Sequence, residues 1–159
     1  MRVVVGSDHA GFKLKEYLKD RLGAWGHSVE DVGTHSTDSC DYPEFGAKVA
    51  RRVVELEGGG KTARGVAVCG SGVGISMAAN KVPGARAALV QEPTSARLSR
   101  QHNDANVICF GERVIGQAVA EEALRVWLET PFEGGRHARR VAQLGEISDK
   151  RLGEATDKR

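Results

Sequence analysis

The sequence has little cysteine and few aromatic residues, and its cysteines are not arranged in pairs. Of 159 residues, three are cysteines, Cys40, Cys69 and Cys109, and no two of them have the CxxC spacing. An odd number of cysteines without that spacing argues against a disulfide framework and against a zinc site. We therefore expect unpaired thiols, as in a reducing compartment, and a cytoplasmic protein.

Long apolar runs and a strong charge imbalance are also missing. No stretch approaches the ~18 apolar residues of a membrane span, and the first apolar run is too short for a signal peptide. The formal net charge is +2, whereas nucleic-acid binding needs a clustered basic face. Neither a membrane nor a nucleic acid is an expected partner. With 40% hydrophobic and 28% charged residues, the composition is typical of a globular domain with one core.

What is present is an alternation of short apolar runs with amphipathic helical patterns. The expected strands cover 2–6, 27–33, 64–70, 84–90 and 105–111, and the expected helices cover 11–23, 43–57, 75–81, 93–103, 115–128 and 136–152. Strands that are apolar on both faces are typical of a parallel sheet with helices on both sides. The sequence predicts a single doubly wound, Rossmann-like α/β domain over 1–152, with a five-stranded parallel sheet, an extra C-terminal helix and a charged tail over 153–159.

The glycine-rich segment "CGSGVG" is the first candidate for a site, because ligands of such sheets bind beyond the carboxyl ends of the strands. Its three glycines, at positions 70, 72 and 74, let the backbone approach a ligand and present N–H groups to an anion. A phosphate or a developing oxyanion would suit this loop, and a tight turn without a ligand is the alternative. Neither a P-loop nor a dinucleotide fingerprint fits, since Ile75 stands where the latter needs glycine.

Three side chains near strand and helix ends each have two interpretations. Cys69 is either a buried apolar filler or, beside a helix N-terminus that favours the thiolate, a base or nucleophile. Asp8 either caps the following helix or acts in catalysis. His102 either compensates a helix dipole or transfers a proton.

A basic segment begins the last helix. Arg136 and Arg140 are four residues apart and share a face, which could bind phosphate oxygens together with Arg113 or could simply be solvated. His137 and Arg139 project to other sides of the helix and are expected at the surface.

Six segments occur in an order and spacing that resemble ribose-5-phosphate isomerase type B: GSDHAGFKLK, DYP, CGSGVGISMAANK, RQHNDANV, FGERVIG and EGGRHARRV. The resemblance extends from residue 2 to about residue 150, and this family includes allose-6-phosphate and galactose-6-phosphate isomerases. It implies a cofactor-free and metal-free aldose–ketose isomerase for ribose 5-phosphate and ribulose 5-phosphate. It also implies a homodimer or homotetramer with the active site between subunits. A six-carbon sugar phosphate as substrate and a non-catalytic sugar-phosphate-binding module remain the alternatives.

The resemblance implies a role for each matching residue. Cys69 would be the general base of the family's cysteine subtype, moving a proton between C1 and C2 through a cis-enediolate; the other subtype has glutamate where Ile75 stands. His102 would open the furanose ring with help from Asp8, and Ser71, where many relatives have threonine, could assist proton transfer. The remaining residues would bind the substrate: the enediolate oxygens by the backbone of Gly70, Gly72, Val73 and Gly74, the phosphate by His9, Arg113, Arg136 and Arg140, and the sugar hydroxyls by Tyr42 and Asn103.

Overall fold

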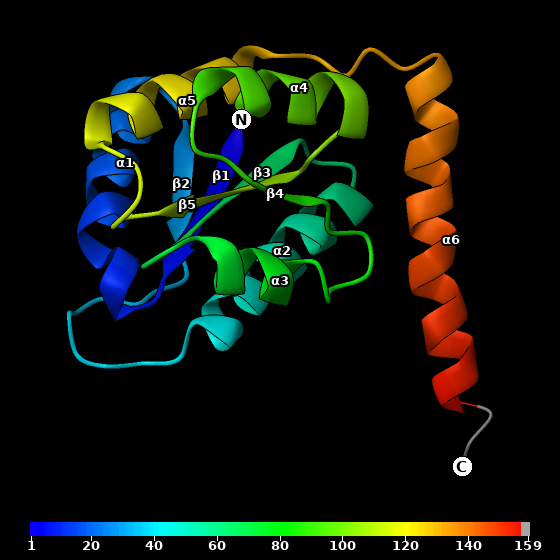
Figure 1. Ribbon diagram of the computed structural model, residues 1–159, viewed down its shortest axis with the longest axis horizontal. Helices are drawn as coiled ribbons and strands as arrows, with labels where there is room; N and C mark the ends of the chain where they lie inside the picture. The colour runs from blue at the N-terminus through cyan, green and yellow to red at the C-terminus, as the bar shows by residue number, and fades with distance from the viewer. Residues whose placement is uncertain (157–159) are drawn as a thin grey trace.

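A computed structural model describes residues 1–156, with side chains through Ile147, so residues 157–159 of the predicted tail lie outside the described part. Strands and helices alternate along the chain (Figure 1), as the sequence predicts. The elements are β1 (Arg2–Ser7), a short 3-10 helix η1 (His9–Gly11), α1 (Phe12–Ala24), β2 (Ser28–Asp31), α2 (Tyr42–Gly58), β3 (Ala63–Cys69), α3 (Val73–Ala79), β4 (Ala87–Leu89), α4 (Pro93–Asn103), β5 (Val107–Gly111), α5 (Gln117–Glu129) and α6 (Arg136–Thr156).

The five strands form one sheet in the order β2-β1-β3-β5-β4, and every neighbouring pair is parallel. The prediction of a five-stranded parallel α/β domain is therefore confirmed. The chain steps outward from β1 to β2 and then returns to the other side of β1 to form β3. The direction of winding thus reverses between β1 and β3, and a crevice opens beyond their carboxyl ends, where ligands of such sheets bind.

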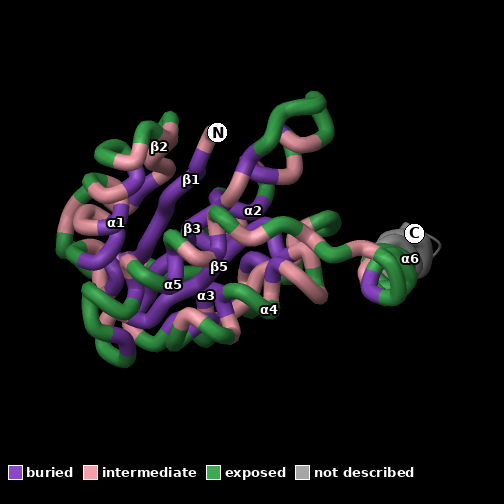
Figure 2. Tube along the Cα trace, turned by 90° about the horizontal axis from the view of Figure 1, so that it is seen from above, coloured by how far each residue is buried: buried purple, intermediate pink, exposed green. Residues whose placement is uncertain are grey.

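Each face of the sheet has its own apolar core, and Figure 2 shows the buried residues concentrated on the strands and the inner sides of the helices. Helices α1, α4 and α5 cover one face, and α2 and α3 cover the other. Large side chains of the first core include Leu14, Leu18, Leu22, Phe110, Leu124 and Trp127. The second core includes Val4, Val49, Val53, Ile75 and Val107. The helices therefore hold the strand ends in fixed positions around the crevice.

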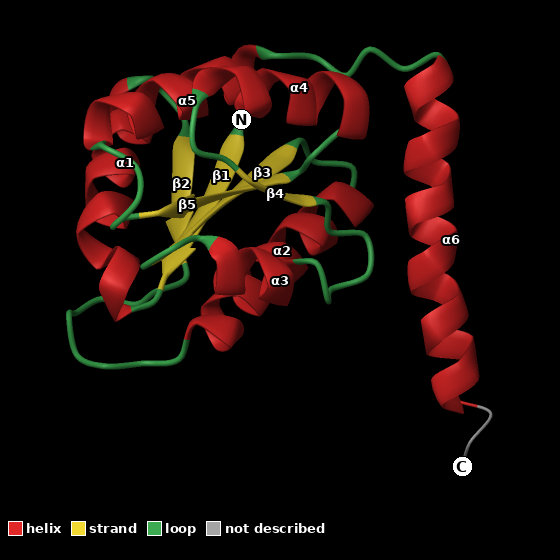
Figure 3. Cartoon of the chain, viewed as in Figure 1, coloured by secondary structure: helices red, strands yellow, loops and turns green. Residues whose placement is uncertain are grey.

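Helix α6 stands away from most of the domain and contacts α4 (Figure 3). Leu144 and Ile147 on this helix are exposed, and they line a cavity of about 500 Å³ whose other wall includes Ala85, Ala87 and Ala88. Apolar side chains of α6 thus lie uncovered within the single chain. Among the described helices, none has the length and apolar character needed to cross a membrane.

Several elements differ in length from the sequence prediction. Strands β2 and β5 are shorter, at Ser28–Asp31 rather than 27–33 and Val107–Gly111 rather than 105–111, and β4 and α6 also differ. Strand β4 has three residues rather than seven, because side-chain oxygens of Asn106 and Asn80 accept the backbone N–H groups of Arg86 and Ala87, respectively. Pairing with β5 begins only at Ala87. Helix α6 continues to Thr156, beyond the predicted end at 152.

Candidate active site

A cavity of about 330 Å³ lies at the carboxyl ends of β1 and β3, where the winding of the sheet reverses. Its residues follow β1, β3 and β5 or begin α2. Eight of the residues predicted from the sequence meet here, together with Ala10 and Val114: Asp8, His9, Tyr42, Cys69, Gly70, Ser71, Gly74 and Arg113. The structure thus brings a thiol, a carboxyl, an imidazole and a guanidinium group around one cavity.

Cys69 is the last residue of β3, and its side chain is engaged by the glycine loop. The N–H of Gly72 donates a hydrogen bond to Sγ at 3.1 Å. Gly72 has a left-handed backbone with φ of 78°, a conformation that favours glycine. The Oγ of Ser71 accepts the N–H of Val73 at 3.3 Å. The loop therefore turns a backbone donor toward the sulfur, and a donor in this position stabilises negative charge on the thiol.

The shape of the loop depends on glycines in neighbouring segments. A Cβ atom on Gly11 would lie 2.6 Å from the carbonyl carbon of Val68, and one on Gly111 would lie 2.3 Å from the carbonyl carbon of Ser71. The backbone N–H of Arg113 donates to the carbonyl oxygen of Gly70 at 3.0 Å. Close backbone contact from both sides thus fixes the path of the chain after β3.

Asp8 and His9 form the wall contributed by β1. The Oδ1 of the buried Asp8 accepts the N–H of Gly11 at 3.0 Å, which confirms that Asp8 caps the following helical turn. The Nδ1 of His9 lies 3.1 Å from both the backbone N and the carbonyl O of Cys40. Because the main chain engages Nδ1, the Nε2 atom of His9 is the ring nitrogen left for a ligand.

Arg113 supplies the permanent positive charge of the cavity. One of its terminal nitrogens lies 3.4 Å from where a Cβ of Gly70 would stand, so glycine at this position leaves room for the guanidinium. The preceding residue, Glu112, accepts the N–H of Leu14 in the first turn of α1 at 2.9 Å. Sequence reasoning missed Glu112, since nothing local shows that its carboxylate caps a helix 98 residues away. This contact ties the arginine loop to α1.

Gly72 and Val73 belong to the loop beside Cys69, whereas the remaining four predicted site residues, His102, Asn103, Arg136 and Arg140, lie toward the opposite edge of the sheet. Helix α4 runs back from the carboxyl edge, so His102 and Asn103 come just before β5 begins. The carbonyl of Asn106 there accepts the N–H of Gly65, four residues before Cys69 on β3. Four residues of strand span about 13 Å. One chain therefore does not bring His102, Asn103 and the start of α6, with the exposed Arg136 and Arg140, to the cysteine cavity.

His137 packs against His102, with ring centroids 4.3 Å apart and planes 7° from parallel. The expectation that His137 points to solvent is wrong, since only 7% of the residue is exposed, whereas Arg139 is exposed as predicted. The segment before α6 folds back onto α4, and the ring of His137 is buried as a result. Partial burial, followed by the nearby His102 and Arg136, lowers the pKa of His137.

Among the described side chains, His102, Glu133 and His137 are the group of three ligand-type residues whose donor atoms lie within 4.8 Å of one another. The two rings are nearly parallel, so their in-plane lone pairs do not point to a common position. The Nε of Arg136 also lies 3.4 Å from the Nε2 of His137. A ring would have to turn, and the guanidinium move, before one ion could bind all three residues.

The fold and the cavity define an α/β enzyme whose site lies at the reversal point of a parallel sheet. A family model described as Ribose/Galactose Isomerase matches residues 3–144. The chain belongs to this isomerase family.

Individual relatives agree with the family. Ribose-5-phosphate isomerase B of Escherichia coli is 45% identical over 150 residues, which cover 94% of this chain and 98% of that protein. The structure of ribose-5-phosphate isomerase B of Clostridium thermocellum is similar with a TM-score of 0.89 and 49% identity, covering 94% of this chain and 99% of that one. The structure of the Mycoplasma genitalium isomerase B, with bound ribulose-5-phosphate, has a TM-score of 0.87 and 36% identity, covering 93% of this chain and 96% of that one.

Proposed function

We propose that this protein interconverts ribose 5-phosphate and ribulose 5-phosphate without a metal or cofactor. The observation that carries the proposal is Cys69, buried at a cavity that also holds Asp8, His9 and Arg113. Membership of the isomerase family and the ribulose-5-phosphate bound to the Mycoplasma relative support the same substrates.

Cys69 would act as a base on the open-chain sugar. Its thiolate removes the proton from C2 of the aldose, and the electron pair moves to the carbonyl oxygen on C1 to give a cis-enediolate. The thiol then returns the proton to C1, while the proton of the C2 hydroxyl moves to the oxygen on C1, and the ketose results. A base poised for this transfer contributes roughly 10²–10⁴-fold. The N–H groups of Gly70, Gly72, Val73 and Gly74 would stabilise the enediolate oxygens, for which those of Gly72 and Val73 would turn from Sγ of Cys69 and Oγ of Ser71. Ser71 would assist the transfer between the oxygens.

We further propose that two chains build each site. His9 and Arg113 offer few positive groups for a phosphate dianion, whereas Arg136 and Arg140 lie exposed at the other edge of the sheet. In a homodimer, or in a tetramer made of dimers, one chain would present the cysteine cavity. The other would supply both arginines for the phosphate, His102 for ring opening with Asp8, and Asn103, which with Tyr42 would bind sugar hydroxyls. The uncovered Leu144 and Ile147 support such an assembly.

The direct test measures ribulose 5-phosphate formation from ribose 5-phosphate with EDTA present. We expect turnover by the wild type and its loss in Cys69→Ala, with ribulose 5-phosphate still bound. Cys109→Ala is the matched control, since this second buried thiol lies in β5, outside the cavity. Turnover that survives Cys69→Ala would contradict the role of the thiol, and an inactive wild type would contradict the substrate.

Mixing two inactive variants tests whether the site is shared. A heterodimer of Cys69→Ala and His102→Ala chains has one site with both wild-type residues and one site with both changes. Mixing, unfolding and refolding the two should therefore restore about one quarter of wild-type activity, because random pairing makes half of the dimers mixed. A site contained in one chain would regain nothing.

Two alternatives to the proposed reaction remain to be tested. A six-carbon sugar phosphate is the second candidate, and a comparison of kcat/KM for ribose 5-phosphate and allose 6-phosphate decides between them. A binding module without catalysis would bind a sugar phosphate equally well as wild type and as Cys69→Ala, and the wild type would turn over neither sugar phosphate.

We also propose that residues 1–152 suffice for activity, without the charged tail at 153–159, and that the protein works in the cytoplasm.

A further inference from the structure

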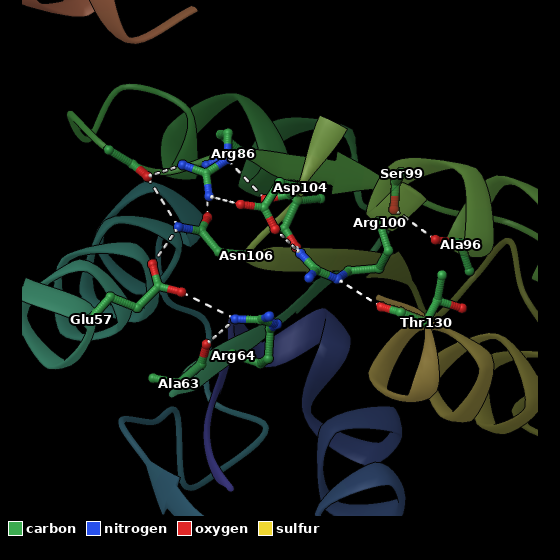
Figure 4. A network of polar contacts seen from close by, with 12 residues as sticks. Glu57, Ala63, Arg64, Arg86, Ala96, Ser99, Arg100, Asp104, Asn106 and Thr130 are labelled. Atoms are coloured by element: carbon green, nitrogen blue, oxygen red, sulfur yellow. Dashed lines mark hydrogen bonds and ion pairs between the residues drawn. The ribbon is translucent and has the colours of Figure 1, made fainter. Parts of the chain in front are cut away.

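Arg100 is a buried charged residue on α4, two positions before His102, and only 4% of it is exposed. One of its terminal nitrogens donates to the Oδ1 of Asp104 at 2.8 Å and to the carbonyl of Ala105 at 2.7 Å (Figure 4). Its Nε donates to the carbonyl of Thr130, at the end of α5, at 3.4 Å. A single guanidinium thus joins the end of α4 to the end of α5.

Asp104 fixes the end of α4 directly after Asn103. Its backbone is left-handed, with φ of 47°, which aspartate tolerates better than most residues. Its Oδ2 accepts a hydrogen bond from Arg86 at 3.0 Å, while Oδ1 accepts from Arg100. We call Arg86, Arg100 and Asp104 the α4 clamp. The clamp holds the last turn of α4 from two sides.

A second contact connects α4 to the segment that leads into α6. The carbonyl of Gln101 accepts the N–H of Glu133 at 3.1 Å. Gly134 and Gly135 follow, both with positive φ, and Arg136 begins α6. Because glycine restricts the backbone least, the path of this segment depends on contacts with α4 such as the hydrogen bonds of Thr130 and Glu133.

We propose that Arg100 is a positioning residue that holds His102 and Asn103 in register with Arg136 and Arg140. All four residues would reach the partner's cavity together, so this inference rests on the proposed function. Arg100 itself would touch no substrate. Packing alone does not explain it, since an apolar residue often replaces a buried charge without loss of stability. A guanidinium, unlike an apolar side chain, can donate hydrogen bonds to acceptors on two separate segments at once.

The test uses Arg100→Lys, which keeps the charge but cannot reach both segments, and Asp104→Asn, which tolerates the left-handed turn but loses the charge. Arg97→Lys is the matched control, because Arg97 is exposed on the same helix. Thermal unfolding first establishes that each variant is folded. The first readout is the imidazole NMR signals of His102 and His137. These two rings stack on each other, and neither substitution changes either ring. We expect these signals to shift in Arg100→Lys, to shift less in Asp104→Asn, and to stay in place in the control.

The second readout compares two reactions of the same site. Ribulose 5-phosphate cannot close a furanose ring, because its C5 oxygen carries the phosphate, so exchange of its C1 hydrogen with deuterated water reports enediolate formation alone. Conversion of ribose 5-phosphate also requires ring opening. In Arg100→Lys we expect the conversion to fall about 10–100-fold, as small displacements of catalytic groups do, and the exchange to fall less.

The two readouts separate the possible failures. Unchanged imidazole signals in folded Arg100→Lys and Asp104→Asn would overturn the inference, whatever the activity. So would conversion and exchange that fall by the same factor at saturating substrate, because a displaced His102 slows only the reaction that requires ring opening, whereas displaced phosphate-binding arginines act mainly on KM. A wild type that performs neither reaction would overturn the proposed function, and the NMR comparison would then decide on the positioning role of Arg100 by itself.

Discussion

The backbone N–H of Gly72 donates a hydrogen bond to the Sγ of Cys69 at 3.1 Å. The left-handed conformation of Gly72 makes this contact possible, and a Cβ there would lie 2.5 Å from Leu89 and 2.8 Å from the backbone of Phe110. Gly72→Ala should therefore lower the free energy of unfolding by about 2–4 kcal/mol through backbone strain and overpacking. It should also abolish isomerisation, because the loop moves away from the sulfur. Urea unfolding and a turnover assay measure the two effects.

Gly23→Ala is the control for that substitution. Gly23 lies in the last turns of α1, and nothing stands within 4 Å of the position of its Cβ. Alanine should stabilise this helix by about 0.5–1 kcal/mol and leave turnover unchanged. A Gly72→Ala protein as stable and active as Gly23→Ala would contradict our description of the loop.

The ring of Tyr42 lies against Gly74, where a Cβ would approach the ring to 2.6 Å. Tyr42 is 41% exposed, so the ring can move into solvent at little cost. Gly74→Ala should change stability by less than about 1 kcal/mol, since alanine favours the helix, but should raise KM several-fold. Steady-state kinetics together with urea unfolding measure this. Tyr42→Phe keeps the ring and removes the hydroxyl, and an equal rise in KM there would assign the effect to the hydroxyl rather than to ring position.

The lowered pKa of His137 predicts how stability depends on pH. Burial, with His102 and Arg136 nearby, favours the neutral ring in the folded state, whereas an unfolded histidine binds a proton below about pH 6.5. Below that value the unfolded chain binds more protons, so the free energy of unfolding should decrease as the pH falls toward the lowered pKa. An NMR titration of His137 should show a midpoint below about 6.5. His137→Gln should have a smaller pH dependence of unfolding than wild type, and an equal dependence would contradict the assignment.

The exposed apolar side chains of α6 predict the assembly state. Leu144→Lys combined with Ile147→Lys should dissociate the proposed dimer and remove its activity, because charges would replace the apolar side chains that line the cavity beside β4. Sedimentation and turnover measure both effects. Val119→Lys is the control, since Val119 is equally an exposed apolar residue but lies on α5. A fully active double variant of unchanged mass would contradict the role of α6.

Sequence patterns predict the part of this molecule that local chemistry determines. Short apolar runs that end at glycine, such as 2–6 and 105–111, predict buried strands. The rule that ligands bind at the carboxyl ends of parallel strands then brings Asp8 and Cys69 together. The same topology explains the position of His102. A helix that leaves the carboxyl edge must end at the amino edge, so His102 lies away from Cys69 in one chain.

The stacking of His137 on His102 has no such local signal. It depends on the contacts of Arg100 with Thr130 and of Gln101 with Glu133, which join residues about 30 positions apart. The sequence predicts a solvent-facing His137 because helical spacing describes only the helix itself. The short β4 has a similar cause, since Asn80 and Asn106 reach its backbone from other elements.

The projecting helix α6 has a consequence for how the activity would respond to protein concentration. In the proposed shared site, a chain with its cysteine at one edge of the sheet and its basic helix at the other would not complete a site by itself. Specific activity would then fall on dilution, once monomers outnumber dimers, and a bound substrate that spans both chains would oppose that fall. The distance between two ends of one small sheet would thus make catalysis a property of the pair rather than of the chain.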